Sequence, residues 1–180
     1  MPVSLKSSKQ QRKDIMDEKA LLPALPVNPM VTGKGLKPDT RYESMLLAKF
    51  INSMMWDGKH TTAERVVYDC LEQLGKKTGK DPMEIFNMAI EMVKPEVELK
   101  SKRVGGTTYQ VPTRVTKKRQ LALTFRWIIG AARSKKGKPM SVRLATEIMD
   151  ASRKEGVAYK KREDTHKMAE ANKAFAHFAY

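Results

Sequence analysis

The chain has 180 residues, 41% of them hydrophobic, and 35 Lys and Arg against 20 Asp and Glu, which gives a net charge of +15. This composition suits one domain with a buried core and excludes wholesale disorder. No apolar run reaches the length of a membrane span, and the single cysteine excludes a disulfide framework and indicates a reducing compartment. Such a basic chain repels itself unless a polyanion neutralises it, and nucleic acid is the commonest such partner.

The positive charge is concentrated in the second half of the chain. Residues 41–93 hold seven basic and eight acidic residues, whereas residues 94–180 hold 21 basic and eight acidic residues. A protein that is merely solvated has no reason to separate its charges in this way. We therefore expect the first helices to be scaffold and the second half to face the polyanion.

Residues 1–38 combine Ser, Lys and Gly with five prolines. We expect them to form an extended arm that is disordered when free, followed by a helical domain over residues 39–180. Asp14, Asp17 and Glu18 argue against an organellar transit peptide.

Three helices are predicted between residues 40 and 95. The first two open with capping boxes, Thr40 to Glu43 and Thr61 to Glu64, and the third has Asp81 as its N-cap. The stop signals are, in turn, Asp57-Gly58, Gly75 and Pro95. Their apolar faces comprise Leu46, Leu47, Phe50, Ile51, Met54 and Met55, then Val66, Val67, Cys70, Leu71 and Leu74, then Ile85, Phe86, Met88, Ala89, Met92 and Val93.

Residues 96–115 change to a period of two, which predicts a β-hairpin around Gly105-Gly106. A three-residue turn through Thr107 would bring the apolar faces of both strands together, so it is preferred to a bare Gly-Gly turn. A lone two-stranded ribbon is marginal in water. We expect it either to pack on the helices or to project as an arm that a partner stabilises.

Three more helices are predicted at about 117–133, 139–155 and 163–178, with Pro139 opening the second of them and Gly156 closing it. The predicted fold is therefore mainly α-helical. It is a single domain of about six helices with one protruding β-hairpin arm, at about 96–115, between the third and fourth helices.

The helix at 117–133 is predicted to carry a basic stripe. On a helical wheel Leu121, Phe125, Ile128 and Ala132 form the buried side. Arg119, Arg126 and Arg133 lie opposite them, and Lys117 and Lys118 stand at the helix start. The planar guanidinium fork suits phosphate, and three arginines in register without an acidic neighbour favour binding over a merely solvated face.

Three further basic groups are candidates for binding. The last helix is predicted to have a basic face and, opposite it, an apolar face. The basic face comprises Arg162, His166, Lys173 and His177, and the apolar face comprises Met168, Ala171, Phe175 and Phe178. Lys160 and Lys161 precede the basic face, and a loop carries Lys135, Lys136 and Lys138. The hairpin places Lys100, Lys102 and Arg103 beside Tyr109. The tyrosine ring suits stacking on an unpaired base and, equally, covering the apolar face of the ribbon.

No catalytic or metal-binding constellation is predicted. His166 and His177 are roughly 16 Å apart along a helix, too far for one metal ion. Glu163 and Asp164 are adjacent and diverge, and His60 has neither a cysteine nor a second histidine nearby. We therefore expect a protein that is not an enzyme and has no cofactor.

Two other classes of binding protein fit the charge. A DNA-binding helical protein could place the helix at 117–133 in a major groove, but Asn and Gln are sparse on the basic stripes and no zipper is present. A membrane-surface protein fits less well, because the apolar faces are needed for the core.

Four segments resemble a known family. They are LLAKFINSMMWDGK (46–59), VELKSKRVGGTTYQVPTRV (97–115), LALTFRWIIGAAR (121–133) and KKREDTHKMAEANKAFAHF (160–178). They are similar to the first helix, the β-arm, the fourth helix and the last helix of the small-subunit ribosomal protein seven family, of bacterial or organellar type. The resemblance extends from about residue 37 to the end. Two departures are a longer and only mildly basic leader at 1–34, and His60 where a basic residue usually follows Gly-Lys.

The resemblance implies a primary binding protein for the 3′ major domain of small-subunit ribosomal RNA that nucleates head assembly. It also implies a place at the subunit interface near the exit-site tRNA and mRNA, in a cytoplasmic or organellar ribosome, with ribosomal proteins nine and eleven as neighbours and no membrane. The expected ribosomal RNA contacts are Lys34, Lys37, Arg41, Lys49, Lys59, Lys117, Lys118, Arg119, Arg126 and Arg133. The residues expected near tRNA and mRNA are Lys100, Lys102, Arg103, Tyr109, Lys160, Lys161, Arg162, His166 and Lys173.

Overall fold

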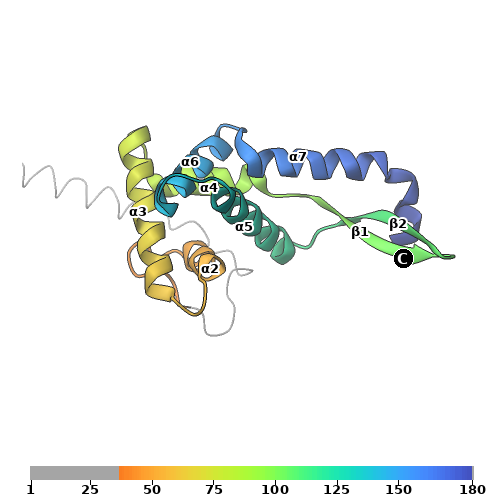
Figure 1. Cartoon of the computed structure of the whole chain (residues 1–180), viewed down its shortest axis with the longest axis horizontal. Helices are drawn as coiled ribbons and strands as arrows, with labels where there is room; N and C mark the ends of the chain where they lie inside the picture. Colours follow the sequence, from red (N-terminus) through yellow and green to blue (C-terminus); the bar gives the residue numbers. More distant parts are fainter. Residues whose placement is uncertain (1–36, 180) are drawn as a thin grey trace, which may run out of the picture. The chain divides into compact units, whose positions relative to one another are not determined.

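The computed structural model describes residues 37–179, so the predicted arm at 1–38, apart from its last two residues, and the candidate Lys34 lie outside the described residues. The elements are α2 (Met45–Met54), α3 (His60–Thr78), α4 (Pro82–Val93), β1 (Val97–Val104), β2 (Thr107–Arg114), α5 (Lys117–Ser134), α6 (Met140–Ser152), α7 (Gly156–Ala171) and the 3-10 helix η2 (Lys173–Ala179). The predicted fold class, mainly helical with one hairpin between α4 and α5, is confirmed (Figure 1).

The core lies where the helical apolar spacings predict it. Helix α6 packs against α3, α4, α5 and α7. Phe50 of α2 is fully buried, and its ring meets those of Phe86 and Phe125 edge-on at 5.2 and 5.3 Å between centroids. Burial of large aromatic rings in this geometry stabilises the packing of α2 on α4 and α5. Met88 was predicted to be buried, but it is half exposed.

The predicted start of α2 is wrong by four residues. Asp39 accepts hydrogen bonds from the backbone N–H groups of Arg41 and Tyr42, which forms a turn before the helix. The helix then begins after Ser44, whose hydroxyl accepts from the backbone N–H of Leu47 at 3.3 Å. A side-chain acceptor at this position satisfies one of the N–H groups that a helix start leaves without a partner.

The capping box expected at Thr61 is also absent. Helix α3 begins at His60, and Lys59 is its N-cap without a side-chain hydrogen bond. Glu64, the expected partner, instead lies 2.9 Å from the hydroxyl of Tyr68. By contrast, Asp81 caps α4 as predicted, because its carboxylate accepts from the backbone N–H of Met83.

The hairpin turn has two residues, so the predicted three-residue turn is wrong. Val104 pairs with Thr107, and Gly105 and Gly106 both have positive φ, 57° and 88°. Two positive φ values in succession match the twist of a hairpin and favour glycine at both positions. In this register Tyr109 lies opposite Lys102, so the apolar residues of β1 and β2 fall on different faces.

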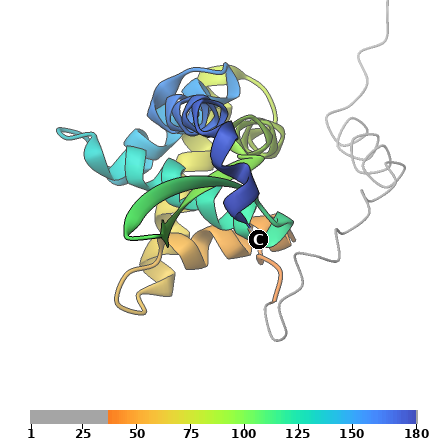
Figure 2. The same cartoon turned by 90° about the vertical axis from the view of Figure 1, so that its right-hand side faces the viewer.

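The C-terminal segment covers the hairpin. Helix α7 runs beside β1 and η2 beside β2, as both views show (Figure 1, Figure 2). The Tyr109 ring lies 5.1 and 5.3 Å from the rings of Phe175 and Phe178, and Lys102 Nζ donates to the carbonyl of Phe178 at 2.7 Å. The hairpin is therefore stabilised from within the chain, and Tyr109 covers its own ribbon.

A buried carboxylate sets the start of α7. Glu147 is fully buried in α6, accepts from the backbone N–H of Ala158 at 2.8 Å and lies 2.7 Å from Lys135 Nζ. The prediction that Gly156 closes the preceding helix is wrong, because Gly156 is the first residue of α7. Its φ is +89°, and a Cβ there would lie 3.1 Å from both Glu147 and Asp150.

Within residues 37–179, no helix has the length and apolar character needed to cross a membrane.

Candidate nucleic-acid interface

The first turn of α5 carries three cations and no acidic residue. Lys117, Lys118 and Arg119 are all exposed there, and the N-cap Thr116 makes no side-chain hydrogen bond to the helix. Positive side chains at a helix N-terminus oppose the helix dipole, and uncapped N–H groups point outward. This end of α5 is therefore suited to an external anion.

Helix α2 adds a lysine to the same place. The pKa of Lys49 is lowered, first by its partial burial and second by the charge of Lys118. Helices α2 and α5 pack against each other, which brings the charge of Lys118 within electrostatic reach of Lys49. Arg126 is exposed two turns further along α5. We call Lys49, Lys117, Lys118 and Arg126 the α2–α5 cationic surface.

Arg119 has an acidic neighbour, contrary to the expectation. Its Nε lies 3.1 Å from the carboxylate of Glu98 on β1, which is also 3.7 Å from Lys100 Nζ. About half of the Arg119 side chain remains exposed, beside a cleft of about 450 Å³ that Arg114 also lines. One carboxylate shared by two cations leaves this region with a positive balance.

Arg133 lies on the surface at the other end of α5. One guanidinium nitrogen donates to the carbonyl of Met54 at 3.1 Å, and the guanidinium lies 5.0 Å from the centre of the Trp56 ring. The basic stripe of α5 thus remains outside the core, as predicted, although Arg119 is paired and Arg133 is stacked.

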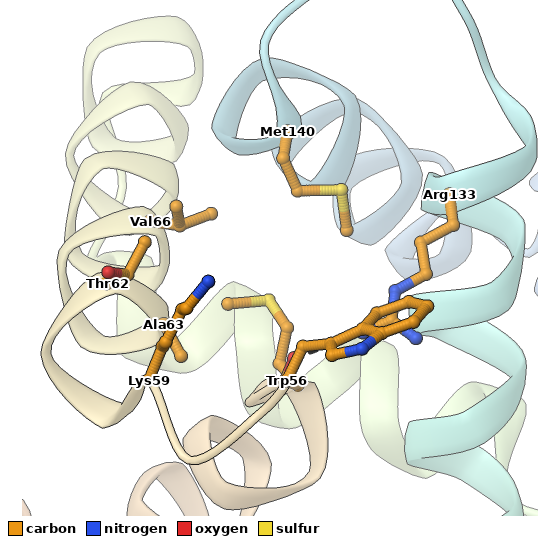
Figure 3. A pocket seen from close by; sticks show the side chains of 8 residues that line it. Trp56, Lys59, Thr62, Ala63, Val66, Arg133 and Met140 are labelled. Carbon is orange, nitrogen blue, oxygen red and sulfur yellow. Dashed lines mark hydrogen bonds between the residues drawn. The ribbon is translucent and has the colours of Figure 1, made fainter.

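Lys59 lies near this ring. It lines a pocket of about 170 Å³ together with Trp56, Arg133 and Met140, and its ammonium points into the opening (Figure 3). Sequence analysis missed Trp56, which is 66% exposed. Nothing in the neighbouring sequence signals this exposure.

The segment before α2 is anchored to α3. The Tyr68 hydroxyl lies 2.6 Å from the buried carboxylate of Asp39, and burial together with this hydrogen bond raises the pKa of Tyr68. The Arg41 guanidinium lies 5.4 Å from the centre of the same ring. Lys37 is exposed and lines a cleft of about 360 Å³ with His60, which is 3.9 Å from the carboxylate of Glu64.

Of the basic face expected on the last helix, Arg162 and His166 turn inward, whereas Lys173 and His177 are exposed. Arg162 Nε donates to the carbonyl of Lys94 at 3.1 Å, and His166 Nε2 accepts from the backbone N–H of Glu96 at 3.2 Å. Burial and the nearby charge of Arg162 lower the pKa of His166. Met168, expected on the buried side, is half exposed.

Several cations of the hairpin and C-terminal segment remain accessible. Lys160 and Lys161 are exposed on α7, Lys173 begins η2, and Arg103 is exposed near the tip of the hairpin. No group of three metal-binding side chains occurs among the described residues.

Comparison with known proteins gives the family. Residues 28–173 match the family model described as ribosomal protein S7p/S5e. The chain belongs to this family. The small ribosomal subunit protein uS7 of Rhodopirellula baltica is 56% identical over 144 residues, which cover 79% of this chain and 92% of that protein. The uS7 of Desulfosudis oleivorans is 53% identical over 156 residues, covering 87% and 96%. That of Bordetella petrii is 55% identical over 150 residues, covering 83% and 96%.

As a family member of the bacterial type, the chain is a structural, non-enzymatic constituent of the small ribosomal subunit and acts in the cytoplasmic ribosome. The match to the family begins at residue 28, nine residues before residue 37, from which the resemblance in the sequence was expected to extend.

Proposed function

We propose that the chain is a primary binding protein for the 3′ major domain of small-subunit ribosomal RNA and nucleates assembly of the subunit head. The observation that carries this proposal is the start of α5, where Lys117, Lys118 and Arg119 are exposed within one turn that has no acidic residue and no side-chain cap. Placing like charges together on a folded surface is unfavourable until a polyanion neutralises them.

The binding free energy comes mainly from phosphate neutralisation and counterion release. The α2–α5 cationic surface supplies the central contacts, and Lys37, Arg41, Lys59, Arg119 and Arg133 add to them. Lys34, which lies outside the described residues, is proposed as a further contact. The stiff helical body gives specificity, because its basic groups match only an RNA whose fold presents phosphates at the same spacings.

We further propose that the hairpin and C-terminal segment lie beside the exit-site tRNA and mRNA, with Lys100, Lys102, Arg103, Lys160, Lys161 and Lys173 toward those RNAs. Tyr109, Arg162 and His166 act indirectly in this proposal. Their contacts with η2, with the residue that follows α4 and with the residue before β1 hold the segment in place. Ribosomal proteins nine and eleven are the proposed neighbours.

The proposal is tested by binding the full chain to isolated RNA fragments. A 3′ major domain transcript and a 5′ domain transcript of equal length are titrated at 50 and 200 mM salt, with duplex DNA as competitor. We expect selective binding to the 3′ major transcript. If 6–10 phosphates are contacted, affinity falls roughly a thousandfold or more over this salt range. Equal affinity for both transcripts, or displacement by duplex DNA at equal concentration, contradicts the proposal.

A further inference from the structure

The loop between α2 and α3 holds the most exposed large hydrophobic side chain of the described residues. Trp56 is 66% exposed although it follows Met54, which is buried in the core. Exposing an indole ring to water is unfavourable, and tryptophan at a surface commonly marks a binding site.

The ring is held in position. Asp57 and Gly58 both have positive φ, and the backbone N–H of Lys59 donates to the carbonyl of Trp56 at 2.9 Å, which closes a tight turn. Arg133 fixes the other side, because its guanidinium stacks on the ring and also donates to the Met54 carbonyl. A preorganised ring loses little conformational entropy when a ligand stacks on it.

The pocket beside the ring has the size of one aromatic group. Trp56, Met140 and the ammonium of Lys59 surround the same opening, and Ala63 and Val66 of α3 line its left side (Figure 3). Its volume of about 170 Å³ is close to the roughly 150 Å³ of a cavity that accepts benzene. Its walls are mostly apolar, as stacking on a ring requires.

The charge at the rim identifies the ligand. Lys59 and Arg133 both line the pocket, and none of its eight lining residues is acidic. A ligand that combines a flat ring with a negative charge fits this arrangement, whereas an apolar protein segment uses neither cation. An unpaired nucleotide supplies both parts, a base for the ring and a phosphate for the cations.

We propose that the Trp56 pocket binds one unpaired nucleotide of the ribosomal RNA, with its base stacked on Trp56 and its phosphates near Lys59 and Arg133. This inference rests on the proposed function and adds to it a site for a single-stranded nucleotide at the edge of a surface that otherwise contacts phosphates.

The test uses the intrinsic fluorescence of the full chain. Of its two tryptophans, Trp127 is buried, so acrylamide quenching of the free protein reports mainly on Trp56. We expect the 3′ major domain transcript to quench the Trp56 emission and to protect it from acrylamide. Trp56→Leu should weaken binding roughly five- to 150-fold, the range for loss of one stacked base, with an unchanged salt slope because no charge is removed.

Two variants separate stacking from general effects. Trp56→Phe keeps a ring and should retain most of the affinity, whereas Met88→Ala removes a comparably exposed apolar side chain of α4 and should change nothing. Circular dichroism checks that each variant is folded.

The outcomes distinguish this inference from the proposed function. If the wild-type chain binds the transcript while Trp56 remains open to acrylamide and Trp56→Leu binds equally well, the pocket inference is overturned and the proposed function stands. If Trp56 becomes protected only when other ribosomal proteins are added, a protein occupies the pocket and the inference is again overturned. Failure of the wild-type chain to select the 3′ major transcript overturns both.

Discussion

The buried carboxylate of Glu147 makes a strong prediction about stability. It joins α6 to the backbone N–H of Ala158, at the start of α7, and to Lys135 in the loop before α6. Glu147→Ala removes the acceptor and leaves that N–H inside the protein without a partner. Removing one member of a buried ion pair typically costs about 3–5 kcal/mol.

The expected cost lies at the lower end of this range. Lys135 is about one-third exposed and keeps a second carboxylate, Asp150, at 3.5 Å, so its charge is not stranded. We therefore expect Glu147→Ala to lower the free energy of unfolding by about 3 kcal/mol. For a chain of this length that corresponds to a fall in Tm of roughly 10 °C.

Urea unfolding followed by circular dichroism measures this change. Glu147→Gln keeps an oxygen for the N–H of Ala158 and loses only the charge, so we expect a smaller loss of about 1–2 kcal/mol. The exposed Glu163→Ala on α7 is the control and should stay within about 0.5 kcal/mol of the wild type. If the Glu147→Ala protein is as stable as this control, Glu147 does not stabilise the fold. If the Ala and Gln variants lose the same free energy of unfolding, the hydrogen bond to the N–H of Ala158 is not important.

Three further predictions concern RNA binding and the C-terminal segment. The double substitution Lys118→Gln, Arg126→Gln should reduce the salt slope of RNA affinity by about 2 and the affinity at 0.1 M salt roughly tenfold to a hundredfold. The control Lys80→Gln, on the α3–α4 loop, should have little effect. Equal salt slopes for the double variant and the wild type in a binding titration contradict the assignment. His166 accepts a hydrogen bond from a backbone N–H, and its pKa is lowered. We therefore expect its contribution to the free energy of unfolding to be complete above pH 6.5 and to be lost as the pH falls through the lowered pKa. A ring that titrates at or above pH 6.5 by NMR contradicts this prediction. Tyr109→Ala should release η2 and speed tryptic cleavage at its first residue roughly tenfold, and unchanged cleavage shows that the ring contacts do not hold the segment.

The elements that follow from local periodicity were predictable. The apolar spacing around Phe50, Leu71 and Ile128 identified α2, α3 and α5 together with their buried faces. Asp81 followed by proline gave the start of α4, because both residues act through the backbone within one turn. These signals depend on neighbours in the sequence and therefore persist in the folded protein.

The errors arose where a distant contact decided the local structure. Asp39 contacts Tyr68, which anchors the segment before α2, and the N-cap of that helix is Ser44 rather than Thr40. Arg162 and His166 bond to backbone groups next to Pro95, so these two polar side chains of α7 turn inward. A helical wheel assigns faces by polarity, and it cannot identify a backbone carbonyl or N–H that is far away in the sequence.

Part of the candidate interface was also predictable. The first turn of α5 and Arg126 stand out in the sequence because cations cluster there without acids. The proximity of Lys49 to Lys118, the pairing of Arg119 with Glu98 and the exposure of Trp56 depend on how the helices pack. None of these three has a sequence signal, because each residue is ordinary in its own segment.

Chemical footprinting of the full chain on intact small-subunit ribosomal RNA tests the central claim most directly. We expect the protected nucleotides to be concentrated in the 3′ major domain, and part of that protection to be lost in the Lys118→Gln, Arg126→Gln protein. Protection scattered over all domains of the RNA, or a footprint that this variant leaves unchanged, contradicts it.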